Sequence, residues 1–444
     1  MFFLFRPPKA AVCFLVLLIS IMYQKLKLKN GLKLILAPLH ETKAVTVLVL
    51  LPVGSRYETK NINGTSHFIE HLMFKGTKKR PTSLDITKEL DSVGAEYNAF
   101  TSKDHTGYYI KIAADKIELA FDLLSDMIFN SVFDPKEIEK ERGVIIEEIN
   151  MYEDNPLIYV EALFEQTVFA PHELSWLISG SKKVIRNVSR QAILGYKNKF
   201  YHPSNVILTV AGNFDKKKVL TLSQKYFNQT KKSIKKSEFK RIKINQAKPR
   251  VNLLFKNTEQ VQLCLGFPSY SLGDRKIFTL YLMAVILGGN MSSRLFTVIR
   301  EQHSLAYYIK AGVSPYQDTG TLVVQAGLDK KRINQAISLI LTELQKIKDD
   351  GVEKKELQNA KEFLKGKLVL DLEDSENVAD WYGKQELLLK KIYTPEERFK
   401  KVMAVGQSQI KKVAQEILKQ QKLNLALIGP FKNKNDFGKL LKLQ

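Results

Sequence analysis

The chain has 444 residues, 44% of them hydrophobic, and a formal net charge of +23 at pH 7. A chain of this length and apolar content is expected to form about two cores rather than one. Its two cysteines, Cys13 and Cys264, exclude a cysteine-based metal site and a disulfide framework. Lysine is scattered along the whole chain and no nucleic-acid-binding module is recognisable, so we expect no nucleic-acid partner despite the charge.

Residues 1–22 contain an apolar run. Arg6 and Lys9 precede the thirteen residues 10–22, which suit the core of a signal peptide and are short for a membrane span. No small-x-small cleavage site follows, and Met22 could itself be the start. Three interpretations stay open, namely a misassigned start, an uncleaved anchor and a cleaved signal. We expect a cytoplasmic enzyme, with a membrane anchor or export through this segment as the alternatives.

Strand and helix signals alternate irregularly from residue 23 onward. Asn30-Gly31 predicts a two-residue hairpin turn, and the β-branched and apolar residues 43–53 predict a strand. Helices are expected over 65–75, 84–93, 115–130 and 135–153. Without regular βαβ spacing, this mixture favours an α+β fold, an antiparallel-rich sheet with helices packed on one face.

The segment His67-Phe68-Ile69-Glu70-His71 places two imidazoles one helical turn apart with a carboxylate beside them. Residues at i and i+4 share a helix face, so both rings can reach one metal ion, and Glu70 points to the same side. Only seven histidines occur in the chain, so this pattern would arise by chance in roughly one chain in a hundred. It predicts a zinc site with a general base, against the simpler interpretation of two surface histidines.

A third ligand is predicted on the helix over 135–153, which Asp134 can cap and Pro135 can begin. At about 100° per residue, Glu141 and Glu148 lie on the edge of its apolar stripe, whereas Glu147 points to water. An inward carboxylate is costly unless a cation compensates it. We predict Glu148 as the third zinc ligand and Glu141 as its supporting partner, the alternative being two ordinary solvated glutamates.

Longer segments resemble the pitrilysin, or M16, family of zinc metallopeptidases, whose inverted motif is HxxEH followed by a distant glutamate. The similar segments, in the expected order, are "HFIEHLMFKGT" at 67–77, "GAEYNAFTSKDHTGYYI" at 94–110, "ERGVIIEEINMYEDNP" at 141–156, "YHPSNVILTVAGNFD" at 201–215 and "LGGNMSSRLFTVIREQHSLAYYIKAG" at 287–312. The resemblance covers residues 24–444. The chain departs from the family pattern at Ser66, where alanine is common, and in "HELSWLISG" at 172–180, so the shape of the substrate chamber is not given by the resemblance.

The resemblance implies the same α+β fold and a role for each matching residue. His67, His71 and Glu148 would hold one zinc ion per chain, and Glu70 would be the general base. Arg300 and Tyr307 match the pair that binds the substrate backbone and steadies the developing oxyanion. Asn98, Ala99, Phe100 and Thr101 resemble the family's edge strand, which binds the peptide by strand addition.

An internal repeat predicts a duplicated domain. "VTVLVLLPVGSRYE" at 45–58 is similar to "VQLCLGFPSYSLGD" at 261–274, about 216 residues later, and "VILTVAGNFD" at 206–215 is similar to "LNLALIGPFK" at 423–432. At this offset His67, Glu70 and His71 correspond to Met283, Ile286 and Leu287. We therefore expect a zinc-binding domain over 23–230, an exposed basic linker over 231–250 and a second domain without the zinc motif over 251–444.

Together these observations predict a zinc-dependent endopeptidase acting on peptides or unfolded protein segments. The alternative is a non-catalytic subunit, because the family contains members that have lost activity. The chain is similar to the short two-domain form of the family, such as the beta-type subunit of the mitochondrial processing peptidase and its bacterial relatives. Four such domains close a chamber, so two chains would be needed; we expect a homodimer, with a heterodimer of related chains as the alternative.

Overall fold

The structure, a computed structural model, describes residues 23–229 and 238–443, so the N-terminal segment 1–22 lies outside the described residues. The first half, residues 23–229, contains a six-stranded sheet with the order β1-β2-β6-β3-β5-β4. Only β2 and β6 pair in parallel. Its strands are β1 Gln24–Lys27, β2 Lys33–Pro38, β3 Ala44–Leu51, β4 Glu96–Thr101, β5 Thr106–Ala113 and β6 Ile207–Gly212.

Eight α-helices accompany this sheet among the described residues. They are α1 Thr65–Leu72, α2 Ser83–Asp91, α3 Ile117–Asn130, α4 Pro135–Asp154, α5 Pro156–Phe169, α6 Lys182–Asn187, α7 Arg190–Phe200 and α8 Lys216–Phe227. The predicted helices are therefore present, each within a few residues of its expected ends. A turn lies where one was predicted, and Gly31 has a φ of 91°, but it is longer than the predicted two-residue turn. Lys27 pairs with Lys33, and the Leu28 N–H donates to the Leu32 carbonyl at 2.9 Å, so that residues 29–31 form the loop.

The second half, residues 250–443, repeats this plan. Its five-stranded sheet has the order β7-β11-β8-β10-β9, and only β7 and β11 pair in parallel. The strands are β7 Arg250–Phe255, β8 Gln260–Ser269, β9 Ala306–Pro315, β10 Gly320–Asp329 and β11 Asn424–Gly429. The helices are α9 Ile277–Gly288, α10 Ile333–Asp349, α11 Lys354–Asp371, α12 Ser375–Lys384, α13 Pro395–Met403, α14 Gln407–Ile417 and α15 Lys434–Leu440.

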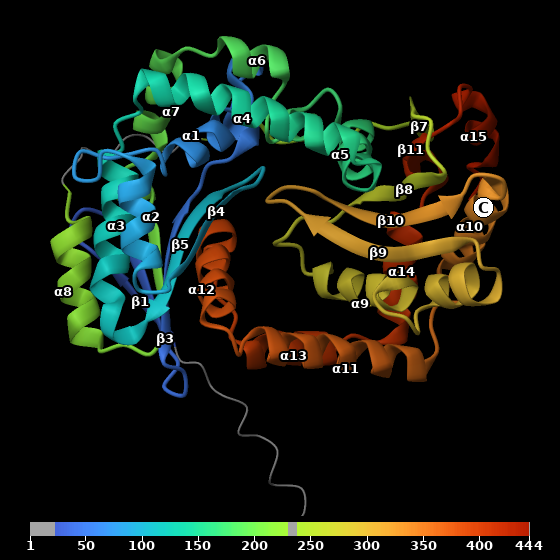
Figure 1. Ribbon diagram of the computed structural model, residues 1–444. Helices are drawn as coiled ribbons and strands as arrows, with labels where there is room; N and C mark the ends of the chain where they lie inside the picture. Colours follow the sequence, from blue (N-terminus) through green and yellow to red (C-terminus); the bar gives the residue numbers. More distant parts are fainter. Residues whose placement is uncertain (1–22, 230–237, 444) are drawn as a thin grey trace, which may run out of the picture.

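The two sheets confirm the duplication. Counted along the chain, β2, β6, β3, β5 and β4 correspond to β7, β11, β8, β10 and β9, and the two spatial orders are the same. The fold is α+β, as predicted, with mixed sheets in which antiparallel pairs dominate. Figure 1 shows the sheets on opposite sides of the molecule, with α4 and α5 crossing between them on one side and α11 and α13 on the other.

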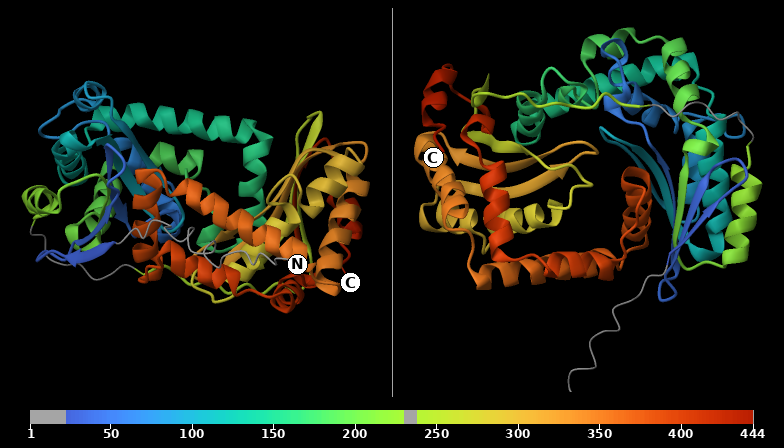
Figure 2. Two further views of the ribbon diagram at one scale, coloured as in Figure 1. Left: turned by 90° about the horizontal axis from the view of Figure 1, so that it is seen from below. Right: turned by 180° about the vertical axis from the view of Figure 1, so that it is seen from behind.

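Each half also contributes one helix to the sheet of the other half. Successive side chains of β3 point to opposite faces of the sheet: Val45, Val47 and Val49 pack with helices of the first half, whereas Leu48 and Leu50 pack with α12. In the same way α5 packs on β8 and β11 of the second sheet. The predicted layer of helices on one face is thus completed by a single helix from the other half on the opposite face, which the two views of Figure 2 also show.

A buried ion cluster joins the halves near the site described below. The Arg56 guanidinium, fully buried, pairs with Asp104 of the first half and Asp318 of the second at 2.9 Å each, and stacks on Phe239 of the linker. Removing the arginine would leave two carboxylates with low exposure and without their cation. The cluster therefore ties both halves and the linker at one point.

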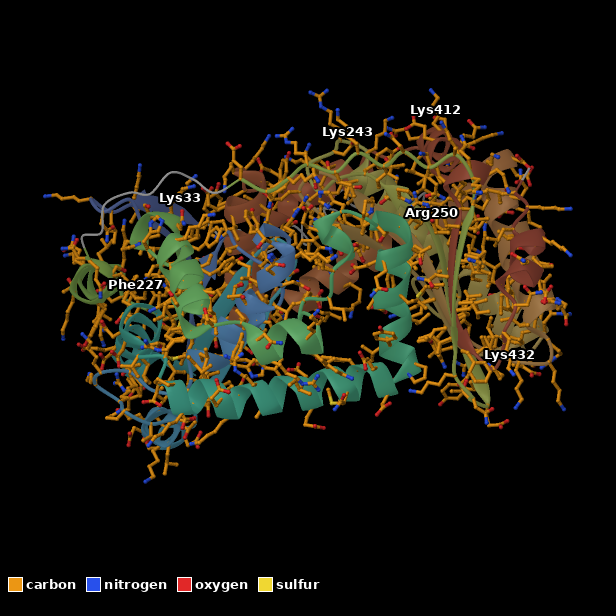
Figure 3. All side chains as sticks on the ribbon, turned by 90° about the horizontal axis from the view of Figure 1, so that it is seen from above. Lys33, Phe227, Lys243, Arg250, Lys412 and Lys432 are labelled. Atoms are coloured by element: carbon orange, nitrogen blue, oxygen red, sulfur yellow. The ribbon has the colours of Figure 1, made fainter. Side chains whose placement is uncertain are left out.

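Positive charge is spread over the surface of both halves. Figure 3 labels Lys33 on β2, Lys243 and Arg250 at the linker, and Lys412 and Lys432 in the second half. Between residues 238 and 249 the lysines and arginine are exposed, while Ile242 and Ile244 pack against α5. None of the helices formed by the described residues is both long and apolar enough to span a bilayer.

Candidate metal centre

Helix α1 presents the two histidines of the motif to α4. Phe68, Ile69 and Leu72 are buried in the core of the first half and fix the rotation of α1. The opposite side of the helix carries His67 and His71, which face α4, since α1 packs against α4 and β4. The Nε2 atoms of the two rings lie 3.3 Å apart. The local sequence therefore directs both imidazoles to one point.

Helix α4 brings the carboxylates. Asp134 accepts a hydrogen bond from the Lys136 N–H at 2.7 Å and caps the helix, with Pro135 at its first position. Glu141 is buried, Glu148 is half-buried and Glu147 is exposed. This is the register that the apolar stripe predicted, so the inward carboxylates point at α1.

Three donor atoms form a triangle. Glu148 Oε2 lies 3.5 Å from His67 Nε2 and 3.4 Å from His71 Nε2. Donors bound tetrahedrally at about 2.0–2.1 Å from zinc are about 3.3–3.4 Å apart, so the triangle has the size that a zinc ion requires. Within residues 23–229 and 238–443, it is the only group of three or more histidine, cysteine or acidic side chains close enough to share a metal ion.

Glu141 and Lys75, behind the triangle, orient the His71 ring. Glu141 Oε2 lies 3.1 Å from His71 Nδ1, and its other oxygen pairs with Lys75 at 2.7 Å. A carboxylate on Nδ1 leaves Nε2 free to bind a metal ion. Buried His67 Nδ1 has no hydrogen-bond partner among the described residues. The residues present thus fit a zinc ion held by two imidazoles and one carboxylate.

Glu70 lies beside this triangle and is tied to the sheet. Its carboxylate accepts a hydrogen bond from the Thr101 hydroxyl at 2.5 Å, at the end of β4. Burial raises the pKa of Glu70, and the Thr101 hydrogen bond opposes that rise. A carboxylate with a raised pKa is better suited to take up a proton near neutral pH.

The two imidazoles differ in protonation. Burial, together with the neighbouring His71, lowers the pKa of His67 to about 4, so its ring is neutral and can donate a lone pair. Burial alone would lower the pKa of His71, but hydrogen bonds with Glu141 and Glu148 raise it to about 9. A metal ion at the triangle would compete with that proton for Nε2.

The site opens into a cleft of about 490 Å³. We call it the metal cleft; about half of the residues that line it are apolar or aromatic, among them Phe100, Ile149, Tyr152, Ile158, Tyr159, Leu177 and Ile178. His67, Glu70 and Glu148 lie in the same wall. Several acidic side chains also reach it but are paired with lysines, as Glu153 is with Lys182 and Glu165 with Lys103. The cleft therefore combines an apolar lining with the polar atoms of the site.

Strand β4, which contains Asn98, Ala99, Phe100 and Thr101, is the outermost strand of its sheet. It pairs with β5 on one side and borders the metal cleft through Phe100 and Thr101. Its unpaired edge could accept another extended chain.

Arg300 and Tyr307 lie together but away from the triangle. Arg300 Nη1 donates to the Tyr307 carbonyl at 2.6 Å, and the guanidinium stacks 5.5 Å from the Tyr307 ring centre. Neither is among the described residues that line the metal cleft. Tyr307 is 73% exposed and borders a different hollow with Asn155 and Leu157. Within one chain the structure therefore brings together the metal triangle and Glu70, but not this pair.

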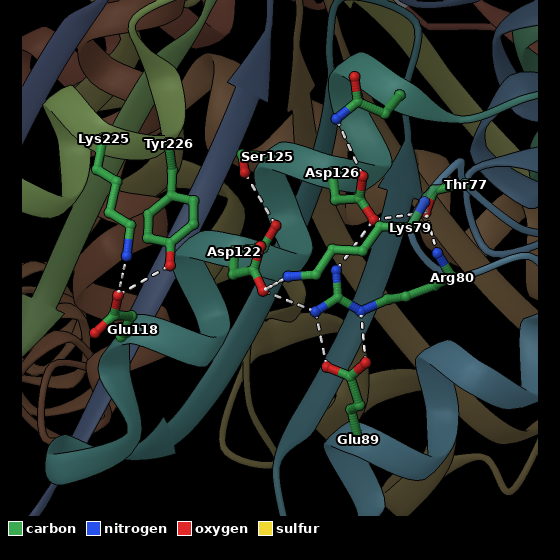
Figure 4. Close-up of polar contacts among 11 residues, drawn as sticks. Thr77, Lys79, Arg80, Glu89, Glu118, Asp122, Ser125, Asp126, Lys225 and Tyr226 are labelled. Carbon is green, nitrogen blue, oxygen red and sulfur yellow. Dashed lines mark hydrogen bonds and ion pairs between the residues drawn. The ribbon is translucent and has the colours of Figure 1, made fainter.

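The segment after α1 is anchored by the buried Arg80. Its guanidinium binds Glu89, Asp122 and Asp126 at 2.7–3.0 Å, and Thr77 also donates to Asp126 (Figure 4). The network fastens residues 77–80 to α2 and α3, which fixes the chain on the C-terminal side of the motif.

Two features of the site were missed by sequence reasoning. Lys75 pairs with Glu141, and a signal was present, since it lies four residues after His71. The hydrogen bond between Thr101 and Glu70 had no signal, because 31 residues separate them.

Comparison with known proteins places the chain in a family. A sequence profile described as "Insulinase (Peptidase family M16)" matches residues 33–178, and one described as "Peptidase M16 inactive domain" matches residues 187–364. The "Uncharacterized zinc protease YmxG" of Bacillus subtilis is 35% identical over 93% of this chain and 99% of its own length. A Streptomyces coelicolor protein, also named a zinc protease, is 32% identical over 92% of this chain and 89% of its own length. The chain belongs to peptidase family M16.

Solved structures show the same fold. A protease from Helicobacter pylori superposes with a TM-score of 0.86 at 24% identity, covering 93% of this chain and all of its own. A Pseudomonas fluorescens structure described as a peptidase M16 inactive domain gives 0.85 at 16% identity, covering 93% of this chain and 99% of its own. The sequence profile described as the inactive domain, which matches residues 187–364, covers mainly the second half, which lacks the metal motif.

Proposed function

We propose that the protein is a zinc-dependent endopeptidase that hydrolyses peptide bonds in peptides or unfolded protein segments. The observation that carries this proposal is the triangle of His67, His71 and Glu148 donor atoms, spaced for zinc, with the half-buried Glu70 beside it and the metal cleft next to it. The names of the relatives support zinc and proteolysis in general terms.

In the proposed peptide hydrolysis, the zinc ion and the side chains of the site would have different roles. A zinc ion held by three protein ligands would lower the pKa of a water molecule and polarise a carbonyl group. Glu70 would accept the proton of the attacking water and deliver it to the leaving amine, a role that needs a carboxylate of raised pKa within reach. Thr101 holds Glu70 in that position. Glu141 and Lys75 keep His71 in the ring orientation that leaves Nε2 available.

Substrate would bind along β4. An extended peptide added to the free edge of residues 98–101 would bond to the backbone N–H and C=O groups of alternate residues, which point away from β5, so that recognition depends mainly on the backbone. The apolar lining of the metal cleft would take side chains on one side of the scissile bond. Because the edge strand ends at Thr101, beside Glu70, a docked peptide passes next to the general base.

A second chain would complete the site. Arg300 and Tyr307 lie outside the metal cleft of their own chain, and the exposed Tyr307 is free to contact another molecule. In a homodimer that closes around the peptide, the partner would supply this pair to steady the developing oxyanion, where one well-placed donor is typically worth about 3–4 kcal/mol. A heterodimer with a related chain is the alternative assembly.

The test is metal content together with peptide cleavage by the purified chain. We expect about one zinc ion per chain, hydrolysis of a mixed peptide library, loss of hydrolysis with a chelator and recovery on adding zinc. A chain that binds no metal and cleaves nothing would favour the non-catalytic subunit. The intact set of His67, Glu70, His71 and Glu148 is the observation against that alternative.

A further inference from the structure

Glu58 lies beneath the start of α1 and is only 4% exposed. Its Oε2 accepts hydrogen bonds from the Gly64 backbone N–H at 2.7 Å and from the Asn63 side-chain amide at 2.9 Å. Its Oε1 accepts from the Ser66 backbone N–H at 2.6 Å. Both oxygens are therefore bound to the residues that begin the metal-binding helix, and Ser66 immediately precedes His67.

The residue at the N-cap position of α1 has no side chain that could cap the helix. The first N–H groups of a helix have no partner within the helix and are usually capped by a side chain at the preceding position. That position is Gly64, with a φ of 99°, where a Cβ atom would come within 2.6 Å of the Ser179 carbonyl oxygen. A side-chain cap is thus sterically excluded there. Glu58, six residues earlier, supplies the missing acceptor oxygens to the Gly64 and Ser66 N–H groups.

The anchoring matters because α1 is short and holds three groups of the site. It has eight residues, a length that is not stable alone in water. His67, Glu70 and His71 all lie in it, and the donor triangle tolerates little displacement, since its edges are only 3.3–3.5 Å. A small rotation of α1 would move both Nε2 atoms relative to Glu148.

The second half, which lacks the zinc motif, has a different contact at the position that corresponds to Glu58. At the 216-residue offset, Glu58 corresponds to Asp274, which is partly exposed and accepts a hydrogen bond from the Lys276 N–H at 2.7 Å just before α9. The acidic residue there serves an ordinary surface turn. In the first half the longer glutamate reaches into the interior.

We propose that Glu58 is a positioning residue of the metal centre. By binding the first residues of α1, it fixes the position and rotation of this helix so that the Nε2 atoms of His67 and His71 lie within ligand distance of Glu148. This inference rests on the proposed function, because it concerns the same metal ion. Glu58 is not one of the three metal ligands, and acts through its hydrogen bonds to Asn63, Gly64 and Ser66.

The experiment compares Glu58→Gln with Glu386→Gln in the full chain. Glutamine has one acceptor oxygen, and its amide would face a backbone N–H, so the start of α1 should shift. Glu386 is an equally buried glutamate, 1% exposed, which binds Lys25 and Lys33 away from α1. Each variant is loaded with Co²⁺, and its visible spectrum, Co²⁺ and Zn²⁺ affinity, thermal unfolding, kcat and KM are measured.

We expect Glu58→Gln to alter the Co²⁺ spectrum, to weaken metal affinity about 10- to 100-fold and to lower kcat more than it changes KM. Glu386→Gln should lose stability but keep the wild-type spectrum and affinity. Glu58→Asp retains both carboxylate oxygens on a side chain that is shorter by one methylene group, and should change the spectrum and the affinity less than Glu58→Gln does. If Glu58→Gln does not fold, Glu58→Asp takes its place in the comparison.

A wild-type spectrum and affinity in the folded Glu58 variant would overturn this inference while leaving the peptidase proposal intact. The inference would also be overturned if the Glu58 variant and Glu386→Gln lost equal stability and the metal affinity of the Glu58 variant fell no further than that of Glu386→Gln. Failure of the wild-type chain to bind either metal would instead overturn the proposed function, and this inference with it.

Discussion

The two halves of the chain have the same sheet topology, but corresponding helix positions carry polar residues in the first half and apolar residues in the second. In the first half α1 carries His67, Glu70 and His71 at a partly open surface. In the second half the corresponding residues of α9, Met283, Ile286 and Leu287, are at most 5% exposed and belong to the core. The fold is therefore stable with apolar residues at this position. Polar groups at the same position are costly unless they are compensated, and a bound zinc ion, as proposed above, would compensate them.

The largest expected difference between the halves is catalytic. Glu70→Gln should lower kcat about 10²–10⁴-fold, because the proton acceptor is lost while the three metal ligands remain. Zinc content should stay near that of the wild type. In the second half, Ile286→Val should cost only about 0.5–1.5 kcal/mol of stability and leave kcat unchanged. Peptide hydrolysis, metal analysis and thermal unfolding measure the three effects; normal turnover in Glu70→Gln would remove this residue from the mechanism.

The second difference concerns metal affinity and tests the register of α4. Glu148→Gln should lose most of the bound zinc, since it removes a ligand. Glu141→Gln should weaken zinc binding about 10- to 100-fold, because it frees the His71 ring. The exposed Glu147 provides the matched control, and Glu147→Gln should bind zinc as the wild type does. The reverse order of Glu147 and Glu148 in a metal titration would contradict the geometry of the site.

Sequence reasoning predicted the parts of the site that depend on local periodicity. The spacing of His67 and His71 and the apolar stripe of α4 determine which side chains share a face, so the triangle was foreseeable. The strand repeat likewise revealed the duplication. The exchange of α5 and α12 between the halves was not foreseeable, because an apolar helix face does not specify which sheet it covers. Contacts across the chain, such as Thr101 with Glu70 and Glu58 with Ser66, also leave no periodic signal.

A smaller effect is expected at the contact between β4 and α1. Thr101→Val keeps the shape of the side chain but removes the hydrogen bond to Glu70, which opposes the rise in the pKa of that carboxyl group. The pKa of Glu70 should therefore increase further. Since the base must be ionised, the acidic limb of the kcat/KM profile should move to higher pH.

Thr106 provides the control for this substitution. It lies opposite Thr101 in the sheet, and its hydroxyl donates to the Val53 carbonyl at 2.8 Å rather than to Glu70. Thr106→Val should leave the acidic limb where it is in the wild type. An equal shift in both variants would mean that the sheet edge, and not the hydrogen bond, determines the protonation of Glu70.

The last prediction asks whether the two halves of one chain serve the same site. If the partner supplies Arg300 and Tyr307, a chain with Glu70→Gln still offers a working second half, and a chain with Tyr307→Phe still offers a working first half. Random mixing of the two then leaves about a quarter of the sites with both halves intact in a closed dimer. Activity should rise from the low level of either parent to about that fraction of wild type. Subunit exchange is followed separately by differently tagged chains; exchange without a rise in activity would place each complete site within a single chain.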